Sequence, residues 1–114
     1  MTQPIDFDNL NMLKSVIGDE LKPILNSYLE LTPKLIEQIR QDIAQQDAPN
    51  LKIHAHTLKG SSANLGATQI PPLSLQLEDM GRHNQLENAG EVFAEIELAY
   101  AQLAQVLQNY IAEF

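Results

Sequence analysis

Two histidines and a lysine lie close together in the middle of the chain, within a stretch that carries no acidic residue. His54 and His56 are two positions apart, Lys59 follows, and no Asp or Glu occurs between Asp47 and Glu78. Histidine is largely neutral near pH 7, and a neutral imidazole nitrogen can act as a nucleophile or a metal ligand. A nearby ammonium group can stabilise a phosphoryl or carboxylate group held there. We therefore look for chemistry in this segment first.

If this segment is a helix, one of its faces surrounds His56 with small, apolar or cationic side chains. Residues three or four positions apart are neighbours on a helix. By this rule the strip around His56 consists of Lys52, Ile53, Lys59, Gly60, Ala63 and Ala67. The opposite strip is mostly apolar and is the expected core side: Leu51, Ala55, Leu58, Ser62 and Leu65. We expect His56 to point towards solvent from a helix that is buried on its other side.

Two neighbours of His56 can be interpreted in more than one way. Glycine inside a helix costs about 1 kcal/mol relative to alanine, so Gly60 needs an explanation. Either another molecule approaches the imidazole closely there, or a helix of the same protein packs over Gly60. Lys59 is either an electrostatic partner for a group on His56 or an ordinary solvated lysine. The pattern alone leaves both questions open.

The other two histidines favour structural roles. His54 lies about 200° round the helix from His56, so the two cannot bind one metal ion from the same face. We expect His54 to be buried or half-buried near Ser61, with a hydrogen-bond partner, and His83, beside Arg82, to be a surface or capping residue. The sequence has no zinc-ligand spacing, glycine-rich phosphate loop or nucleophile elbow. We therefore expect no metal or cofactor in this chain and no kinase activity of its own.

The composition describes an acidic chain with one cationic segment. Its 114 residues carry 15 Asp and Glu against 7 Lys and Arg, a net charge of −8, and no cysteine. The 51–70 segment contains two lysines and no acid. This balance argues against nucleic-acid and anionic-membrane partners, and no apolar run is long enough to span a bilayer. The length suits one domain, residues 1–114, which we expect to be monomeric and cytoplasmic.

Apolar residues recur every three or four positions along the whole chain, which predicts an all-α fold. We expect a short helix capped by Asp8 and stopped by Gly18, followed by longer helices over about 20–45, 47–65, 68–83 and 86–113. The connections between them are short, which predicts an antiparallel four-helix bundle with an additional short N-terminal helix. Asp47 and Gly66 are the expected caps of the 47–65 helix.

Some residues predict irregularities in these helices. Pro33 should kink or break the 20–45 helix, and Pro71–Pro72 should distort the start of the 68–83 helix. Gly81 suggests fraying or an early stop. The large side chains expected to face inward are Leu10, Leu13, Val16, Ile17, Leu21, Leu25, Tyr28, Leu35, Ile39, Ile43, Leu73, Leu77, Met80, Phe93, Ile96, Tyr100, Leu103, Leu107 and Tyr110.

The run HTLKGSSANLGA, from His56 to Ala67, closely resembles the signature of the histidine-containing phosphotransfer (HPt) domain. In that family a histidine is followed by any residue, a leucine or similar residue, Lys-Gly, a Ser or Ala pair, and a closing Gly-Ala. The match is nearly complete over these 12 residues, and the chain fits the family in length and helix order. The Pro71–Pro72 pair is the visible departure.

This resemblance implies a role for each residue around His56. His56 would be the phosphorylated nucleophile, Lys59 its electrostatic partner and Gly60 the position that leaves clearance. Family members also tend to have a Gln or Glu on the next helix that hydrogen-bonds to the imidazole. Glu78, 22 residues after His56, matches that position, and Gln76 is the second choice if the two prolines shift the register.

The resemblance also implies partners. The chain would accept a phosphoryl group from the aspartyl phosphate of a receiver domain in a hybrid sensor kinase and pass it to a response regulator. The receiver would supply Mg²⁺ and most of the catalytic groups. The docking surface would include Lys52, Ile53, Gly60 and Ala63, with exposed residues of the first two helices. The alternative is a binding module of the same fold that sequesters a signalling partner without being phosphorylated.

Overall fold

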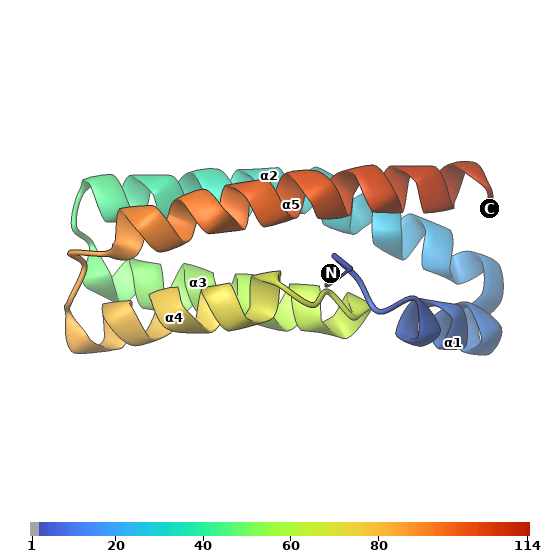
Figure 1. The fold of residues 1–114 in the computed structure, drawn as a ribbon, viewed down its shortest axis with the longest axis horizontal. Helices are drawn as coiled ribbons and strands as arrows, with labels where there is room; N and C mark the ends of the chain where they lie inside the picture. Colours follow the sequence, from blue (N-terminus) through green and yellow to red (C-terminus); the bar gives the residue numbers. More distant parts are fainter. Residues whose placement is uncertain (1–2) are drawn as a thin grey trace.

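In the computed structural model, which describes residues 3–114, the chain is almost entirely helical. Its elements are α1 (Phe7–Ile17), a 3₁₀ turn η1 (Gly18–Glu20), α2 (Leu21–Ala44), α3 (Ala48–Leu65), α4 (Ile70–His83) and α5 (Ala89–Ala112). Helices α2 to α5 form an antiparallel bundle, and α1 lies at one end of it (Figure 1). This confirms the predicted fold class.

The helices of the bundle differ in length, and α1 compensates for the difference. Helices α2 and α5 have 24 residues each, whereas α3 has 18 and α4 has 14. Figure 1 shows α1 beyond the turn between α3 and α4, beside the ends of α2 and α5. The segment before α1 is fixed to that turn, because the Asp6 amide donates to the Gly66 carbonyl at 2.8 Å and Ile5 forms a β-bridge with Ala67.

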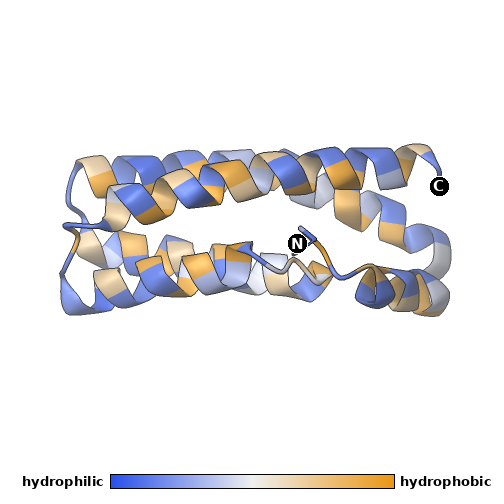
Figure 2. Ribbon diagram, viewed as in Figure 1, coloured by the Kyte–Doolittle hydropathy of each residue, from blue (hydrophilic) through white to orange (hydrophobic). Residues whose placement is uncertain are grey.

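The core runs along the inside of the bundle. Hydrophobic and hydrophilic residues alternate along every helix (Figure 2), as expected when one stripe of each is buried. The largest fully buried side chains are Ile5, Leu10, Leu21, Leu25, Ile39, Leu51, Leu58, Ile70, Leu77, Ile96, Leu103 and Leu107. Tyr28 and Ser62 form a buried hydrogen bond of 2.7 Å between α2 and α3. Most inward positions expected from the sequence are buried or partly buried.

Helix α3, which carries His54 and His56, has the predicted ends and the predicted buried face. The Asp47 carboxylate accepts from the Asn50 amide at 3.2 Å, and Gly66 ends the helix with a left-handed φ of 91°. The buried residues of α3 include the whole predicted core strip: Leu51, Ala55, Leu58, Ser62 and Leu65. The opposite face of α3 is therefore the exposed one.

Helix α1 differs in detail from the sequence prediction. Its cap is Asp6, whose carboxylate accepts from the amides of Asp8 and Asn9, and not Asp8. Val16 was expected to face inward but is 76% exposed, because α1 covers only one end of the bundle. Ala67, expected on the His56 strip, lies beyond the end of α3 and is buried against the N-terminal segment.

Pro33 does not break α2, which remains helical from Leu21 to Ala44. A proline inside a helix leaves the carbonyl four residues earlier without its usual donor. Here that carbonyl belongs to Leu29, and the Tyr100 hydroxyl on α5 donates to it at 3.5 Å. The loss of one intrahelical hydrogen bond is thus partly offset from a neighbouring helix.

The prediction for Gly81 was wrong: it does not fray α4 but allows α3 and α4 to pack closely. A Cβ atom at Gly81 would lie 2.7 Å from the Lys52 amide nitrogen and 2.8 Å from the Ala48 carbonyl oxygen. Helix α4 continues past Gly81 to His83, and its two prolines fall in the first turn, where their missing N–H groups cost little. Because the backbones of α3 and α4 are so close, side chains on one helix can contact side chains on the other.

Candidate functional site

His56 lies on the exposed face of α3, midway along the helix. Its side chain is 67% exposed, while its helix neighbours Ala55 and Leu58 are fully buried. The buried face anchors the helix, so the imidazole is presented to solvent from a rigid support. This is the orientation that the apolar pattern predicts.

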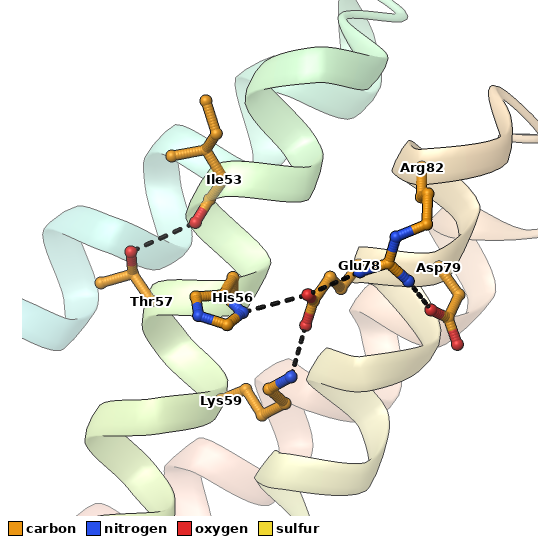
Figure 3. Close-up of polar contacts among 7 residues, drawn as sticks. All are labelled: Ile53, His56, Thr57, Lys59, Glu78, Asp79 and Arg82. Atoms are coloured by element: carbon orange, nitrogen blue, oxygen red, sulfur yellow. Dashed lines mark hydrogen bonds and ion pairs between the residues drawn. The ribbon is translucent and has the colours of Figure 1, made fainter.

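Glu78 contacts the imidazole from α4. Its Oε2 atom lies 3.0 Å from His56 Nδ1, and its side chain is only 5% exposed. In Figure 3 the other ring nitrogen of His56, Nε2, points away from Glu78. An ionised carboxylate can only accept hydrogen bonds, so Nδ1 carries the proton and Nε2 of the neutral ring has a free lone pair.

Lys59 pairs with the other oxygen of the same carboxylate. Its Nζ atom lies 2.7 Å from Glu78 Oε1, and the lysine side chain is 29% exposed. Lys59 is therefore not an ordinary solvated lysine. The imidazole and the ammonium group, one turn apart on α3, both contact Glu78 (Figure 3).

Arg82 is a fourth member of the cluster and was not predicted. Its guanidinium lies 3.0 Å from Glu78 Oε2 and also pairs with Asp79 on the same helix. The spacing of four residues from Glu78 could have indicated this contact, because side chains at that spacing are neighbours on a helix. In the sequence Arg82 stands out only as a neighbour of His83.

These contacts keep Glu78 ionised although it is buried. The close contact with Lys59 is the main cause that lowers the pKa of the Glu78 carboxyl, and the hydrogen bond from His56 adds to it, while burial opposes both. The net effect is a lowered pKa. At neutral pH the carboxylate is thus a fixed negative charge behind the imidazole ring.

The surface around His56 is open. A Cβ atom at Gly60 would meet no atom within 4 Å, so no helix among residues 3–114 packs over Gly60. Lys52, Ile53 and Ala63 are exposed around it, and Ile53 is 58% exposed. Gln76 lies elsewhere, in the groove between α4 and α5, so the structure places Glu78 and not Gln76 beside the imidazole.

His54 faces a different part of the molecule. Its Nδ1 atom lies 2.5 Å from Oδ2 of Asp42, a buried residue on α2, and its own side chain is half-buried. The expected half-buried histidine with a hydrogen-bond partner is therefore present, and Asp42 is the partner. His83 is exposed in the last turn of α4. Within residues 3–114, no three side chains of the His, Asp and Glu types are grouped so that they could hold a metal ion.

Comparison with known proteins gives matches over most of the chain. The family model described as "Hpt domain" matches residues 23–106. The phosphorelay intermediate protein rdeA of Dictyostelium discoideum is 21% identical over 87 residues, which are 76% of this chain and 34% of that protein. The aligned part is thus about a third of that relative's length.

A solved structure matches the complete fold. The crystal structure of histidine-containing phosphotransfer protein B from Pseudomonas aeruginosa PAO1 superposes with a TM-score of 0.95, covering 100% of this chain and 99% of that one at 22% identity. No helix in the described part of the chain is both long and apolar enough to cross a membrane.

Proposed function

Since this chain belongs to the Hpt domain family, whose members act in phosphotransfer, we propose that His56 receives a phosphoryl group from one receiver domain and delivers it to another. The observation that carries this proposal is the arrangement of His56 itself. Its Nδ1 atom is held by Glu78 while Nε2 points away from that carboxylate, on an exposed side chain (Figure 3).

The transfer step requires little from this chain. The Nε2 lone pair attacks the phosphorus of an aspartyl phosphate, the new N–P bond forms, and the bond between phosphorus and the aspartyl oxygen breaks. The aspartate leaves as a carboxylate with the electron pair, in a loose, in-line transition state. No proton has to move, because Nε2 of the reacting tautomer carries none. The reverse step returns the phosphoryl group to the aspartate of a second receiver.

Glu78 and Lys59 stabilise opposite charges in this step. After the attack the imidazole ring is positively charged, so its Nδ1–H bond to the ionised Glu78 becomes a charge-assisted one. The phosphoryl oxygens are negative, and Lys59, one turn along α3 from His56, supplies a cation for them. We propose that Mg²⁺ and the remaining catalytic groups belong to the receiver domain.

The exposed surface next to His56 favours docking of such a partner. Gly60 leaves open space beside the ring, and Ile53 provides exposed apolar area. On α2, Ile24 and Leu31 are also exposed and line a groove between α2 and α3 together with Thr57 and Ser61. We propose that the receiver domains of a hybrid sensor kinase and of a response regulator dock over this surface. We also propose that the chain acts as a monomer in the cytoplasm.

The experiment is incubation of the purified chain with a phosphorylated receiver domain. We expect a phosphoprotein that is labile in acid and stable in alkali, and we expect His56→Gln to abolish it. If the label persists in His56→Gln, His56 is not the phosphorylated residue. If the wild-type chain binds receivers without becoming labelled, and His56→Gln binds them equally well, the protein is a sequestering module instead.

A further inference from the structure

Arg82 and His56 contact the same oxygen atom of Glu78. The guanidinium and the imidazole Nδ1 each lie 3.0 Å from Oε2, and the transfer step above assigns nothing to Arg82. We propose that Arg82 is a positioning residue that keeps Oε2 directed at the imidazole and so maintains the Nδ1–H tautomer of His56. This inference rests on the proposed role of His56 as the nucleophile.

The position of Arg82 suits this task because it holds Glu78 from their own helix. Glutamate followed four residues later by a cation is the favourable order for such a pair on a helix. The other end of the guanidinium is held by Asp79, also on α4, so Arg82 is fixed on both sides (Figure 3). His56 and Lys59, in contrast, reach Glu78 from α3.

Arg82 already holds Oε2 in the resting protein, and the need for it becomes greatest during transfer. In the resting protein Lys59 is paired with Glu78 Oε1 at 2.7 Å. A phosphoryl group arriving at Nε2 presents negative oxygens that compete with Glu78 for this lysine. When Lys59 turns towards the phosphoryl group, Glu78 loses the ammonium on Oε1. Arg82 then remains as the cation paired with the carboxylate, on Oε2.

A carboxylate as buried as Glu78 depends on such a partner. Its side chain is 5% exposed, so water cannot replace a lost donor fully. Without Arg82, the departure of Lys59 would leave His56 as the remaining donor, and the carboxylate could rotate or take up a proton. In either case the ring would lose the acceptor that fixes its tautomer.

The test combines a measurement on the resting protein with one on transfer. Nitrogen-15 NMR of the imidazole reports which ring nitrogen of His56 carries the proton, and single-turnover transfer from a phosphorylated receiver reports the rate. In Arg82→Gln we expect a shift of His56 away from the Nδ1–H tautomer. The loss of the part-exposed ion pair with Glu78 should also slow transfer about two- to fivefold. Arg82→Lys, which keeps the charge, should restore part of both.

Arg40→Gln is the matched control. It removes the other arginine of the chain and its ion pairs with Glu37 and Glu97, which lie on α2 and α5 and do not touch His56. We expect it to leave both readouts unchanged. If Arg82→Gln is poorly folded by circular dichroism, Asp79→Asn serves instead, because it releases only the second anchor of the guanidinium and should change both readouts in the same direction by less.

Two results would overturn the inference. One is an Arg82→Gln protein with the tautomer of the wild type. The other is slower transfer without any tautomer change, which would make Arg82 a docking residue. The NMR measurement needs no receiver, so it separates this inference from the proposed function. A tautomer shift in a chain that never accepts a phosphoryl group would refute phosphotransfer and leave the positioning role of Arg82 intact.

Discussion

His56 Nδ1 and Glu78 Oε2 lie 3.0 Å apart across the interface of α3 and α4, and this contact holds one nitrogen of the imidazole and leaves the other free of Glu78. The carboxylate is buried and ionised, while the ring is largely exposed. The close approach of the two helices at Gly81 keeps α4 near enough for Glu78 to reach the ring. Helix packing thus sets the position of the carboxylate beside His56.

The open space at Gly60 predicts that a long side chain there blocks transfer without disturbing the fold. Gly60→Gln would place its side chain beside the imidazole, where the structure has no atom within 4 Å of a Cβ. The added side chain would displace the incoming phosphoryl group from the imidazole. Because small displacements of reacting groups greatly lower reaction rates, we expect transfer to slow by about 100-fold. Gly90→Gln is the matched control, since Gly90 is equally open but lies on α5. Unimpaired transfer in Gly60→Gln would refute the clearance argument, and circular dichroism checks the fold.

The two helix glycines Gly60 and Gly81 should respond oppositely to the same substitution. Gly60→Ala fills open space and removes the helix penalty of glycine, so it should raise the free energy of unfolding by about 0.5–1 kcal/mol. Gly81→Ala places a Cβ 2.7 Å from the Lys52 backbone nitrogen, so the helices must separate. We expect it to lower the free energy of unfolding by about 1–3 kcal/mol. Urea titrations measure both, and equal shifts of the same sign would contradict this assignment.

Local features of the fold could be predicted from the sequence, whereas contacts between helices were harder to predict. The ends of α3 at Asp47 and Gly66, and its buried strip, depend on neighbouring residues and were placed correctly. The packing role of Gly81 depends on how closely another helix approaches, which a single sequence does not reveal. The same holds for the Leu29 carbonyl, which finds a donor on α5 after Pro33 removes its own.

In the site, too, some features could be predicted from the sequence and others could not. The position of Glu78 beside His56 followed from the spacing in the family that the sequence resembles. Arg82, the second cation beside Glu78, was missed. It shares one carboxylate oxygen with His56, and such sharing depends on how the side chains are oriented. The partner of His54 was also missed, since Asp42 lies on α2 and is distant from His54 in sequence.

The lowered pKa of Glu78 predicts part of the acid sensitivity of the fold. Above its ordinary value of 4.5 the carboxyl is ionised in both the folded and the unfolded chain, so its native contacts stabilise fully. Below 4.5 the unfolded chain takes up the proton first, and this stabilisation is lost as the pH falls through the lower native pKa. Glu78→Gln has no such proton to bind. Its free energy of unfolding should therefore fall less steeply than that of the wild type on acidification below about pH 4.5; parallel curves would contradict this.

The proposed docking surface predicts that a charge at Ile53 weakens transfer, whereas the same charge on another face does not. Ile53 is 58% exposed beside His56, and Leu98 is 68% exposed on α5. We expect Ile53→Glu to raise the receiver concentration needed for half-maximal transfer about tenfold, because it removes apolar contact and adds a negative charge facing the aspartyl phosphate of the receiver. Leu98→Glu should leave that concentration unchanged. Equal effects of the two substitutions would show that the receiver does not dock around Ile53.

The identity of the phosphorylated nitrogen tests the central proposal most directly. The chain, labelled with nitrogen-15 in its histidines, is phosphorylated by a receiver domain, and NMR coupling between phosphorus and nitrogen identifies the bonded atom. Because Glu78 holds Nδ1 and leaves Nε2 free, we predict that phosphorus is bonded to Nε2 of His56. Phosphorus on Nδ1, or on any residue other than His56, would contradict the proposed mechanism.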